Sequence, residues 1–215
     1  MTVGRVRKPP YRVGPWTVND ARVVYDNPWI RITDAAVTRP DGAPGQYGTV
    51  HFKNRAVGVL AIDDEGRAPL VGQHRFPLDA YSWELPEGGG PLAEDPLAAA
   101  KRELAEETGY RAATWTPLAA FDLSNSVTDE VSVCYLATDL TAGSAAPEPE
   151  EALAIRLTPF AELYDRVRAG DIRDSLTVVM VLMAHAKALA GELPQAAADL
   201  ILKSGRNFDD GGGPA

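Results

Sequence analysis

The chain has 215 residues, and its 21 Lys and Arg against 30 Asp and Glu give a net charge of −9. This length suits one domain with an extension and excludes two large domains. An acidic chain has no long-range attraction for nucleic acid or anionic lipid, so neither is expected as a partner. The single cysteine, Cys134, excludes an intrachain disulfide and fits a reducing compartment.

No apolar run approaches the roughly 20 residues that a membrane span requires. The longest, at 178–184, has seven residues. The first ten residues are basic, but no apolar stretch follows them, as a secretory signal would require. We therefore expect a cytoplasmic protein that does not cross a membrane.

The N-terminal part of the chain predicts antiparallel strands. Residues 1–20 are rich in Pro and Arg and are expected at the surface or partly disordered. Two β-type runs at 22–26 and 30–37 mix β-branched and polar residues, and turn-forming residues follow at 39–44. This pattern predicts an antiparallel β-meander.

The next segment combines strands with a glycine run. Apolar runs at 56–62 and 68–73 flank a turn at 63–66, which predicts a hairpin. The stretch 83–90 then leads from an apolar strand end into three glycines. It predicts a rigid loop whose backbone can approach a ligand closely.

Helix signals dominate the rest of the chain. Asp95 is placed to cap a helix at 96–108, with Pro96 in its first position and Gly109 ending it. The later elements are expected as a strand at 131–136, a loop at 141–150, a helix at 159–169 capped by Thr158 and ended by Gly170, a longer helix from Asp174 to about Ala190 ended by Gly191, and a frayed tail at 205–215.

Three carboxylates share one face of the helix at 96–108. Glu103, Glu106 and Glu107 are related by i, i+3 and i+4, whereas another face can pack on a sheet through Leu97, Ala100, Leu104 and Thr108. Like charges at this spacing repel, so the cluster needs a compensating cation. Hard carboxylate oxygens suit Mg²⁺ or Mn²⁺.

A solvated helix face is the alternative interpretation, because Glu is a good helix former. Arg102 can pair with Glu106 at i+4, but such pairs are common on surfaces. The glycine run that precedes the helix favours a site, since a glycine loop that leads into a carboxylate helix can hold a diphosphate and a metal ion.

The segment 88–110 resembles the Nudix box, which reads Gly, five residues, Glu, seven residues, Arg-Glu, an aliphatic residue, any residue, Glu-Glu, any residue, Gly and an aliphatic residue. Its positions are filled here by Gly88, Glu94, Arg102, Glu103, Leu104, Glu106, Glu107, Gly109 and Tyr110. Only Tyr110 departs from the pattern, and this departure concerns core packing rather than chemistry.

The resemblance implies an α/β fold: a Nudix α/β/α sandwich with a mixed β-sheet at 51–195. An N-terminal antiparallel β extension at 1–50 would precede it and mediate homodimerisation, and a tail at 196–215 would follow. The implied activity is metal-dependent hydrolysis of a nucleoside diphosphate linked to another moiety.

The resemblance also implies roles for the box residues. Glu103 and Glu107 would be the main metal ligands, Glu106 a further ligand or a base, and the carbonyl of Glu87 a backbone ligand. Arg102 would orient the glutamates. Mg²⁺ is the expected cofactor, with Mn²⁺ possible, and bound metal would stabilise diphosphate charge and activate water.

Outside the box, residues 20–190 resemble the ADP-ribose pyrophosphatase branch of the family. In that branch Arg75 would contact the diphosphate, Glu84 would line the pocket, and Gly88 would let the backbone approach the substrate. A strand-end arginine can also be an ordinary surface ion-pair residue, and Trp83 is expected in the core rather than as a base-stacking platform.

The loop before the strand of Cys134 aligns with the loop that carries a catalytic glutamate in this branch. Glu130 is the candidate base and Asp129 the second choice, against the alternative of a solvated loop acid. The branch typically has a proline where this chain has 124–126, Ser-Asn-Ser. That departure concerns the identity of the substrate, because the loop borders the moiety beyond the second phosphate.

The remaining chemical side chains receive no catalytic role. His51, His74 and His185 are too scattered in the sequence to form a metal site, and Cys134 lies in an apolar run that predicts burial. Trp29 is expected to pack, although it could stack on a base across a dimer interface.

These observations lead to one expected reaction, hydrolysis of ADP-ribose to AMP and ribose 5-phosphate. Within the enzyme class the alternatives are a GDP- or UDP-sugar or a housekeeping nucleotide. From other classes come a nucleotide-sugar-binding module without activity and a purely structural dimer.

Overall fold

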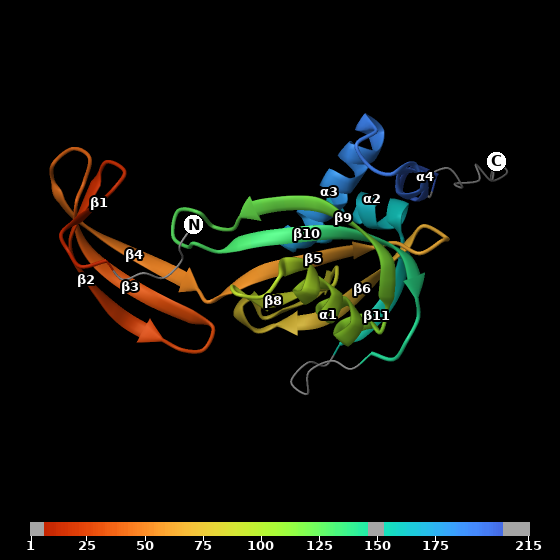
Figure 1. Ribbon diagram of the computed structural model, residues 1–215, viewed down its shortest axis with the longest axis horizontal. Helices are drawn as coiled ribbons and strands as arrows, with labels where there is room; N and C mark the ends of the chain where they lie inside the picture. The colour runs from red at the N-terminus through yellow and green to blue at the C-terminus, as the bar shows by residue number, and fades with distance from the viewer. Residues whose placement is uncertain (1–6, 146–152, 204–215) are drawn as a thin grey trace, which may run out of the picture. The chain divides into compact units, whose positions relative to one another are not determined.

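The computed structural model describes residues 7–145 and 153–203, and these residues form two compact units (Figure 1). The first unit comprises the chain up to Ala56 together with 91–93 and 121–132, and the second comprises the remainder. The tail expected at 205–215 and the second half of the loop expected at 141–150 lie outside the described residues.

A four-stranded antiparallel sheet forms most of the first unit. Its strands follow in chain order: β1 (Tyr11–Val13), β2 (Trp16–Asp26), β3 (Ile30–Thr38) and β4 (Pro44–Phe52). The Arg39 N–H donates to the Ala43 carbonyl at 2.9 Å and closes the turn between β3 and β4. The meander prediction is confirmed, and its strands begin inside the segment 1–20.

Two sheets form the frame of the second unit. One has the order β8-β5-β10-β9, and the other has the antiparallel order β11-β6-β7. The strands are β5 (Asn54–Ala61), β6 (Arg67–Arg75), β7 (Ala80–Glu84), β8 (Glu87–Pro91), β9 (Arg111–Asp122), β10 (Val131–Thr141) and β11 (Ala154–Pro159).

Helices cover both faces of β5. Val57 and Val59 are fully buried in one cluster with Ala100 and Leu104 of α1 (Pro96–Thr108). Gly58 points to the opposite face, where a Cβ would lie 2.8 Å from Cε of Met180 on α3 (Ser175–Ala190). Glycine lets that helix approach the sheet, and the α/β/α arrangement is confirmed.

Glycines end the three predicted helices as expected, but of the three predicted N-caps only Asp174 forms its hydrogen bond; Asp95 precedes α1 without a side-chain cap hydrogen bond. Gly109 ends α1 in the left-handed region at φ 75°, and Asp174 caps α3 by accepting the Thr177 N–H at 2.7 Å. The helix prediction at 159–169 was wrong at its start, because Thr158 lies in β11 with a buried side chain. The strand runs on to Pro159, so α2 (Phe160–Ala169) begins after it.

Two further predictions are corrected. The runs around the turn at 63–66 do not form a hairpin, because β5 and β6 belong to different sheets. The turn itself forms: the Gly66 N–H donates to the Asp63 carbonyl at 2.9 Å. The Ile62 N–H donates to the Ala137 carbonyl in β10, and the Gly66 carbonyl accepts from the Phe160 N–H, so segments later in the chain pair with the residues on both sides of the turn.

The glycine run is the second correction, since it forms strand β8 rather than a loop. Helix α4 (Gln195–Lys203) was not expected either. In the described residues no single helix has the length and apolar character for a membrane span; α3 and α4 reach it only when taken together, across a bend of 114°.

Candidate active site

Strand β8 brings the box glycine against a box carboxylate. A Cβ on Gly88 would lie 2.3 Å from Cδ of Glu103 and 2.5 Å or less from both of its carboxylate oxygens. Any side chain at position 88 would therefore occupy the space of this carboxylate. Glu103 is buried, with 9% of its surface exposed.

A second box carboxylate is held by the neighbouring residue on the same strand. The backbone N–H of Glu87 donates to Oε2 of Glu107 at 3.1 Å, and Glu107 is 4% exposed. Glu103 and Glu107 therefore lie against one dipeptide, Glu87–Gly88. This is the stretch whose carbonyl is predicted as a backbone metal ligand.

Arg102 connects the remaining carboxylate to this group. Its Nη1 donates to Glu103 at 2.8 Å and to Glu106 at 3.0 Å, and its Nη2 donates to the Gly89 carbonyl at 3.2 Å. Burial alone would lower the pKa of Arg102, but the charge of Glu103 and the hydrogen bonds to both glutamates raise it. The guanidinium thus stays charged and holds the two carboxylates in place.

The chemistry of these donors fits a hard divalent cation. Glu103, Glu106 and Glu107 offer carboxylate oxygens on one helix, and the absence of a Cβ at Gly88 leaves the backbone of β8 close to them. Within the part of the chain that the structure describes, no three His, Cys, Asp or Glu side chains already enclose a metal position. Glu103 and Glu106 instead share the Arg102 guanidinium.

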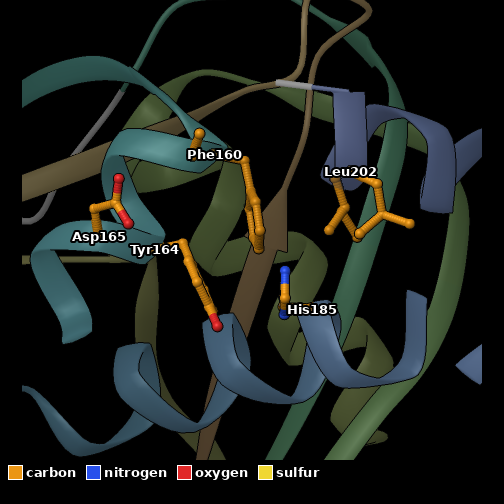
Figure 2. Close-up of a pocket in the computed structure, with 7 residues that line it drawn as sticks. Phe160, Tyr164, Asp165, His185 and Leu202 are labelled. Carbon is orange, nitrogen blue, oxygen red and sulfur yellow. The ribbon is translucent and has the colours of Figure 1, made fainter. Parts of the chain in front are cut away.

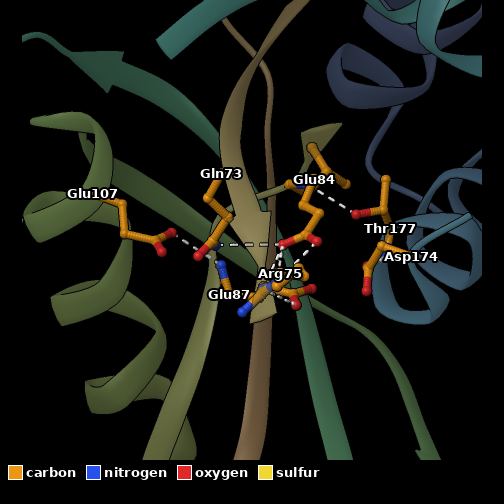
Figure 3. Close-up of polar contacts among 8 residues, drawn as sticks. Gln73, Arg75, Glu84, Glu87, Glu107, Asp174 and Thr177 are labelled. Carbon is orange, nitrogen blue, oxygen red and sulfur yellow. Dashed lines mark hydrogen bonds and ion pairs between the residues drawn. The ribbon is translucent and has the colours of Figure 1, made fainter. Parts of the chain in front are cut away.

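Arg75 lies at the end of β6 in a second charged group (Figure 3). Its Nε donates to both carboxylate oxygens of Glu84 at 3.0 Å, and its Nη2 contacts Glu84 and also Glu87, the latter at 3.0 Å. Burial would lower the pKa of Arg75, but these carboxylates raise it. Arg75 thus forms ion pairs with two carboxylates, while 35% of its side chain stays exposed.

The Glu87 side chain is the feature that the sequence did not reveal. Burial, together with the charges of Asp174 and Glu84, raises its pKa well above the ordinary value. Its Oε2 is buried and has no hydrogen-bond partner among the described residues. Nothing in the spacing indicates this contact; the only signal is a charged residue between a proline and a glycine.

The start of α3 packs against the same strands. The Leu85 N–H donates to Oγ1 of Thr177 at 2.9 Å, and both groups are buried. Asp174, which caps the helix, contributes its charge to the surroundings of Arg75 and Glu87. Asp174 was predicted only as a cap, so its place beside this group comes from the structure (Figure 3).

The two candidate bases belong to the first unit and differ in their contacts. Asp129 accepts the Phe52 N–H at 2.9 Å and pairs with Nδ1 of His51 at 2.9 Å, while Nε2 of His51 meets Thr33 at 3.0 Å. Asp129 therefore has a structural role. Burial, and then the Asp129 charge, raise the pKa of Glu130, which makes its carboxylate a stronger base.

The loop at 124–126 is held by backbone contacts within the first unit. Ser124 has φ 40°, and its carbonyl accepts from Val127 and Thr128 at 3.0 Å each. The Ser126 carbonyl accepts from the Tyr47 hydroxyl at 2.6 Å. A tight turn thus forms here without the proline typical of the branch.

The other candidates keep no catalytic role. Cys134 is fully buried, and His74 pairs at 3.1 Å with Asp79 on the surface. Trp83, expected in the core, is half-buried and meets Tyr81 edge to face at 5.7 Å. Trp29, expected to pack, is 64% exposed.

His185 lies in a small concavity between α2, α3 and α4, apart from the box. Its ring stacks on Tyr164 with 4.1 Å between centroids (Figure 2). The concavity has a volume of about 200 Å³ and is lined by Phe160, Ala161, Tyr164, Asp165, His185, Ile201 and Leu202. The two stacked rings form part of its lining, which agrees with a structural role for His185.

Comparison with known families agrees with this arrangement. Residues 52–177 match the NUDIX domain, and residues 16–50 match the nucleoside diphosphate sugar hydrolase N-terminal domain. The first match covers more than half of the chain and includes the whole box. The chain belongs to the Nudix family.

Two individual relatives and one solved structure are similar to large parts of this chain. The chain is 40% identical over 134 residues to an ADP-ribose pyrophosphatase of Mycobacterium tuberculosis, across 61% of this chain and 65% of that protein, just under two thirds of its length. It is 30% identical to an ADP-sugar pyrophosphatase of Mus musculus, across 82% and 88%. A solved structure of an ADP compounds hydrolase shares the fold, with a TM-score of 0.73 at 21% identity over 82% of this chain and 95% of that one.

Proposed function

We propose that this protein hydrolyses the diphosphate linkage of a nucleoside diphosphate sugar, with ADP-ribose as its substrate and AMP and ribose 5-phosphate as products. The observation that carries the proposal is the placement of Glu103 and Glu107 against Glu87–Gly88, with Arg102 across Glu103 and Glu106. Membership of the Nudix family and the names of the two relatives support the same reaction.

The carboxylates of this group would hold a divalent cation. Glu103 and Glu107 are the main ligands, Glu106 is a further ligand, and the Glu87 carbonyl completes the set. Mg²⁺ is the expected ion, with Mn²⁺ as a substitute. When bound, such an ion neutralises diphosphate oxygens and lowers the pKa of a water molecule.

The chain's own groups then position the substrate and move one proton. Arg75 contacts the diphosphate, and Gly88 allows the backbone to approach it. The oxygen of water bonds to one phosphorus, and the bridging oxygen leaves with the other phosphate. Glu130 is the proposed base that takes the proton from water; burial and the charge of Asp129 raise its pKa, which makes its carboxylate a stronger base.

Product analysis tests the reaction directly. The protein is incubated with ADP-ribose, a GDP-sugar and a UDP-sugar, each with Mg²⁺ or with a chelator. We expect AMP from ADP-ribose, faster than product from the others, and only with metal. Faster cleavage of another nucleotide sugar would contradict the substrate, and tight binding without cleavage would indicate a sensor.

Variants assign the chemistry to the residues. Glu106→Gln should lower turnover by a factor of about 10² or more, because it weakens charge stabilisation while preserving shape. Glu162→Gln is the matched control, because this glutamate also pairs with an arginine, Arg156, at 2.5 Å. Equal rates for both variants would remove the site assignment.

The proposal extends to assembly and location. The strands β2, β3 and β4 would form a homodimer interface, since residues 16–50 match a domain of nucleoside diphosphate sugar hydrolases. The protein would work in the cytoplasm, where a lone buried Cys134 remains reduced.

A further inference from the structure

Two carboxylates from two different strands hold Arg75. The Glu84 carboxylate on β7 accepts hydrogen bonds from Nε and Nη2, and the Glu87 carboxylate on β8 accepts one from Nη2 at 3.0 Å. Within the described residues, Nη1 makes no hydrogen bond. Because about a third of the side chain is exposed, this nitrogen is the part of the guanidinium left for a ligand.

Glu87 also contacts the box through its backbone. Its N–H donates to Glu107 at 3.1 Å, and the next residue, Gly88, lies against the Glu103 carboxylate. One residue therefore touches the arginine through its side chain and the box glutamates through its main chain. The side chain is 13% exposed, and one of its oxygens is buried without a partner in the described part of the chain.

We propose that the Glu87 side chain is a positioning residue. It sets the direction of the Arg75 guanidinium relative to β8, the strand whose backbone contacts Glu103 and Glu107 of α1. A diphosphate bound to metal at the box and to Arg75 must reach both at once, so their separation controls binding. The inference rests on the proposed function, in which Arg75 contacts the diphosphate. Glu84 fixes the arginine to its own sheet, and Glu87 links it to β8.

The test compares Glu87→Ala with Glu87→Gln and with the control Glu162→Ala, which also removes a carboxylate from an arginine. In Glu87→Ala the KM for ADP-ribose should rise about tenfold while kcat stays within about threefold, because binding rather than chemistry is affected. Glu87→Gln should raise the KM less than Glu87→Ala does, since its amide oxygen still accepts from Nη2. Glu162→Ala should change neither constant.

Two readouts are independent of turnover. Calorimetry in chelator should show ADP-ribose and inorganic pyrophosphate binding about tenfold more weakly to Glu87→Ala. The affinity of the nucleotide-free protein for Mn²⁺ should stay within about twofold. On an Arg75→Ala background, Glu87→Ala should have no further effect, because the residue it positions is gone.

Different outcomes separate the two proposals. If wild type cleaves ADP-ribose and Glu87→Ala matches it in every constant, the positioning role is wrong and the proposed function stands. If wild type binds pyrophosphate without cleaving any nucleotide sugar and Glu87→Ala weakens that binding, the proposed function is wrong and the positioning role stands. Mn²⁺ affinity that falls together with diphosphate affinity, or an additive effect on the Arg75→Ala background, overturns the positioning role.

A folding defect would not leave the question open. Glu87→Asp retains the carboxyl group but shortens the side chain, so this group cannot reach Arg75 as closely. We expect a KM between those of wild type and Glu87→Ala. A KM equal to that of wild type would contradict the positioning role.

Discussion

At the scale of single residues, Gly88 matters because the Glu103 carboxylate lies where a side chain at position 88 would be. A Cβ at position 88 would lie 2.3 Å from the carboxylate carbon. Gly88→Ala must therefore displace Glu103, and a shift of about 1 Å at a catalytic group can cost a factor of about 10² in rate. We expect that loss in kcat/KM. Gly170→Ala is the control, because open space surrounds this glycine at the end of α2; equal activity of the two variants would contradict the contact.

The raised pKa of Glu130 predicts how the rate falls on the acid side of the pH–rate profile. A general base must be ionised, and burial, with the charge of Asp129, raises the pKa of Glu130. The rate should therefore fall as the pH drops through a value above the ordinary glutamate pKa of about 4.3. Measured kcat against pH should show this limb, and Glu130→Gln should remove it while lowering kcat by about 10² or more. An unchanged limb in Glu130→Gln would assign it to another group.

The box residues could be predicted because their partners are close in the sequence. The pairing of Arg102 with Glu106 follows from helical spacing, and the structure places them at 3.0 Å. The contact of Glu87 with Arg75 could not be predicted in the same way, because it spans two strands from different sheets. Asp174 joins the group from a helix that begins nearly 90 residues later, and no local pattern carries that information.

At the scale of elements, the end of α1 matters because it follows directly on Glu106 and Glu107. Gly109 has φ 75°, and a Cβ there would lie 2.6 Å from the Ala145 nitrogen; Gly170, which ends α2 at φ 80°, has open space around it. Gly170→Ala should cost about 1 kcal/mol of unfolding free energy for the left-handed conformation alone. Gly109→Ala should cost more, since the clash adds to it. Urea unfolding of both variants measures the difference, and equal losses would mean that the neighbouring backbone yields.

Element prediction succeeded where a residue type fixes a boundary. Pro96 and Gly109 mark both ends of α1, and Gly191 marks the end of α3. It failed where strand pairing determines the structure. A turn at 63–66 is compatible with a hairpin, but the buried strands β5 and β6 each pair with strands from later in the chain. The glycine run reads as a loop by composition, yet pairing beside β5 makes it a strand.

At the scale of the whole molecule, the exposed apolar side chains of β2 bear on assembly. Val23, Val24 and Tyr25 are consecutive and 47–51% exposed, at a point where the pairing of β2 with β3 is irregular, so they form a continuous stretch of exposed apolar side chains on this strand. Exposed apolar surface of this kind commonly marks an interface. This is the observation that supports the proposed homodimer.

The assembly can be tested by sedimentation at several protein concentrations. Wild type should sediment as a species of twice the 23.0 kDa chain mass, and Val24→Asp should shift it to the monomer, because a carboxylate in an apolar interface must be desolvated. Leu189→Asp is the matched control, since Leu189 is 67% exposed on α3, outside this sheet, and should leave the dimer intact. A monomeric wild type, or a Val24→Asp protein that remains dimeric, would place the interface elsewhere or abolish it. If the dimer also supports nucleotide binding, the KM of Val24→Asp should rise while that of Leu189→Asp stays unchanged.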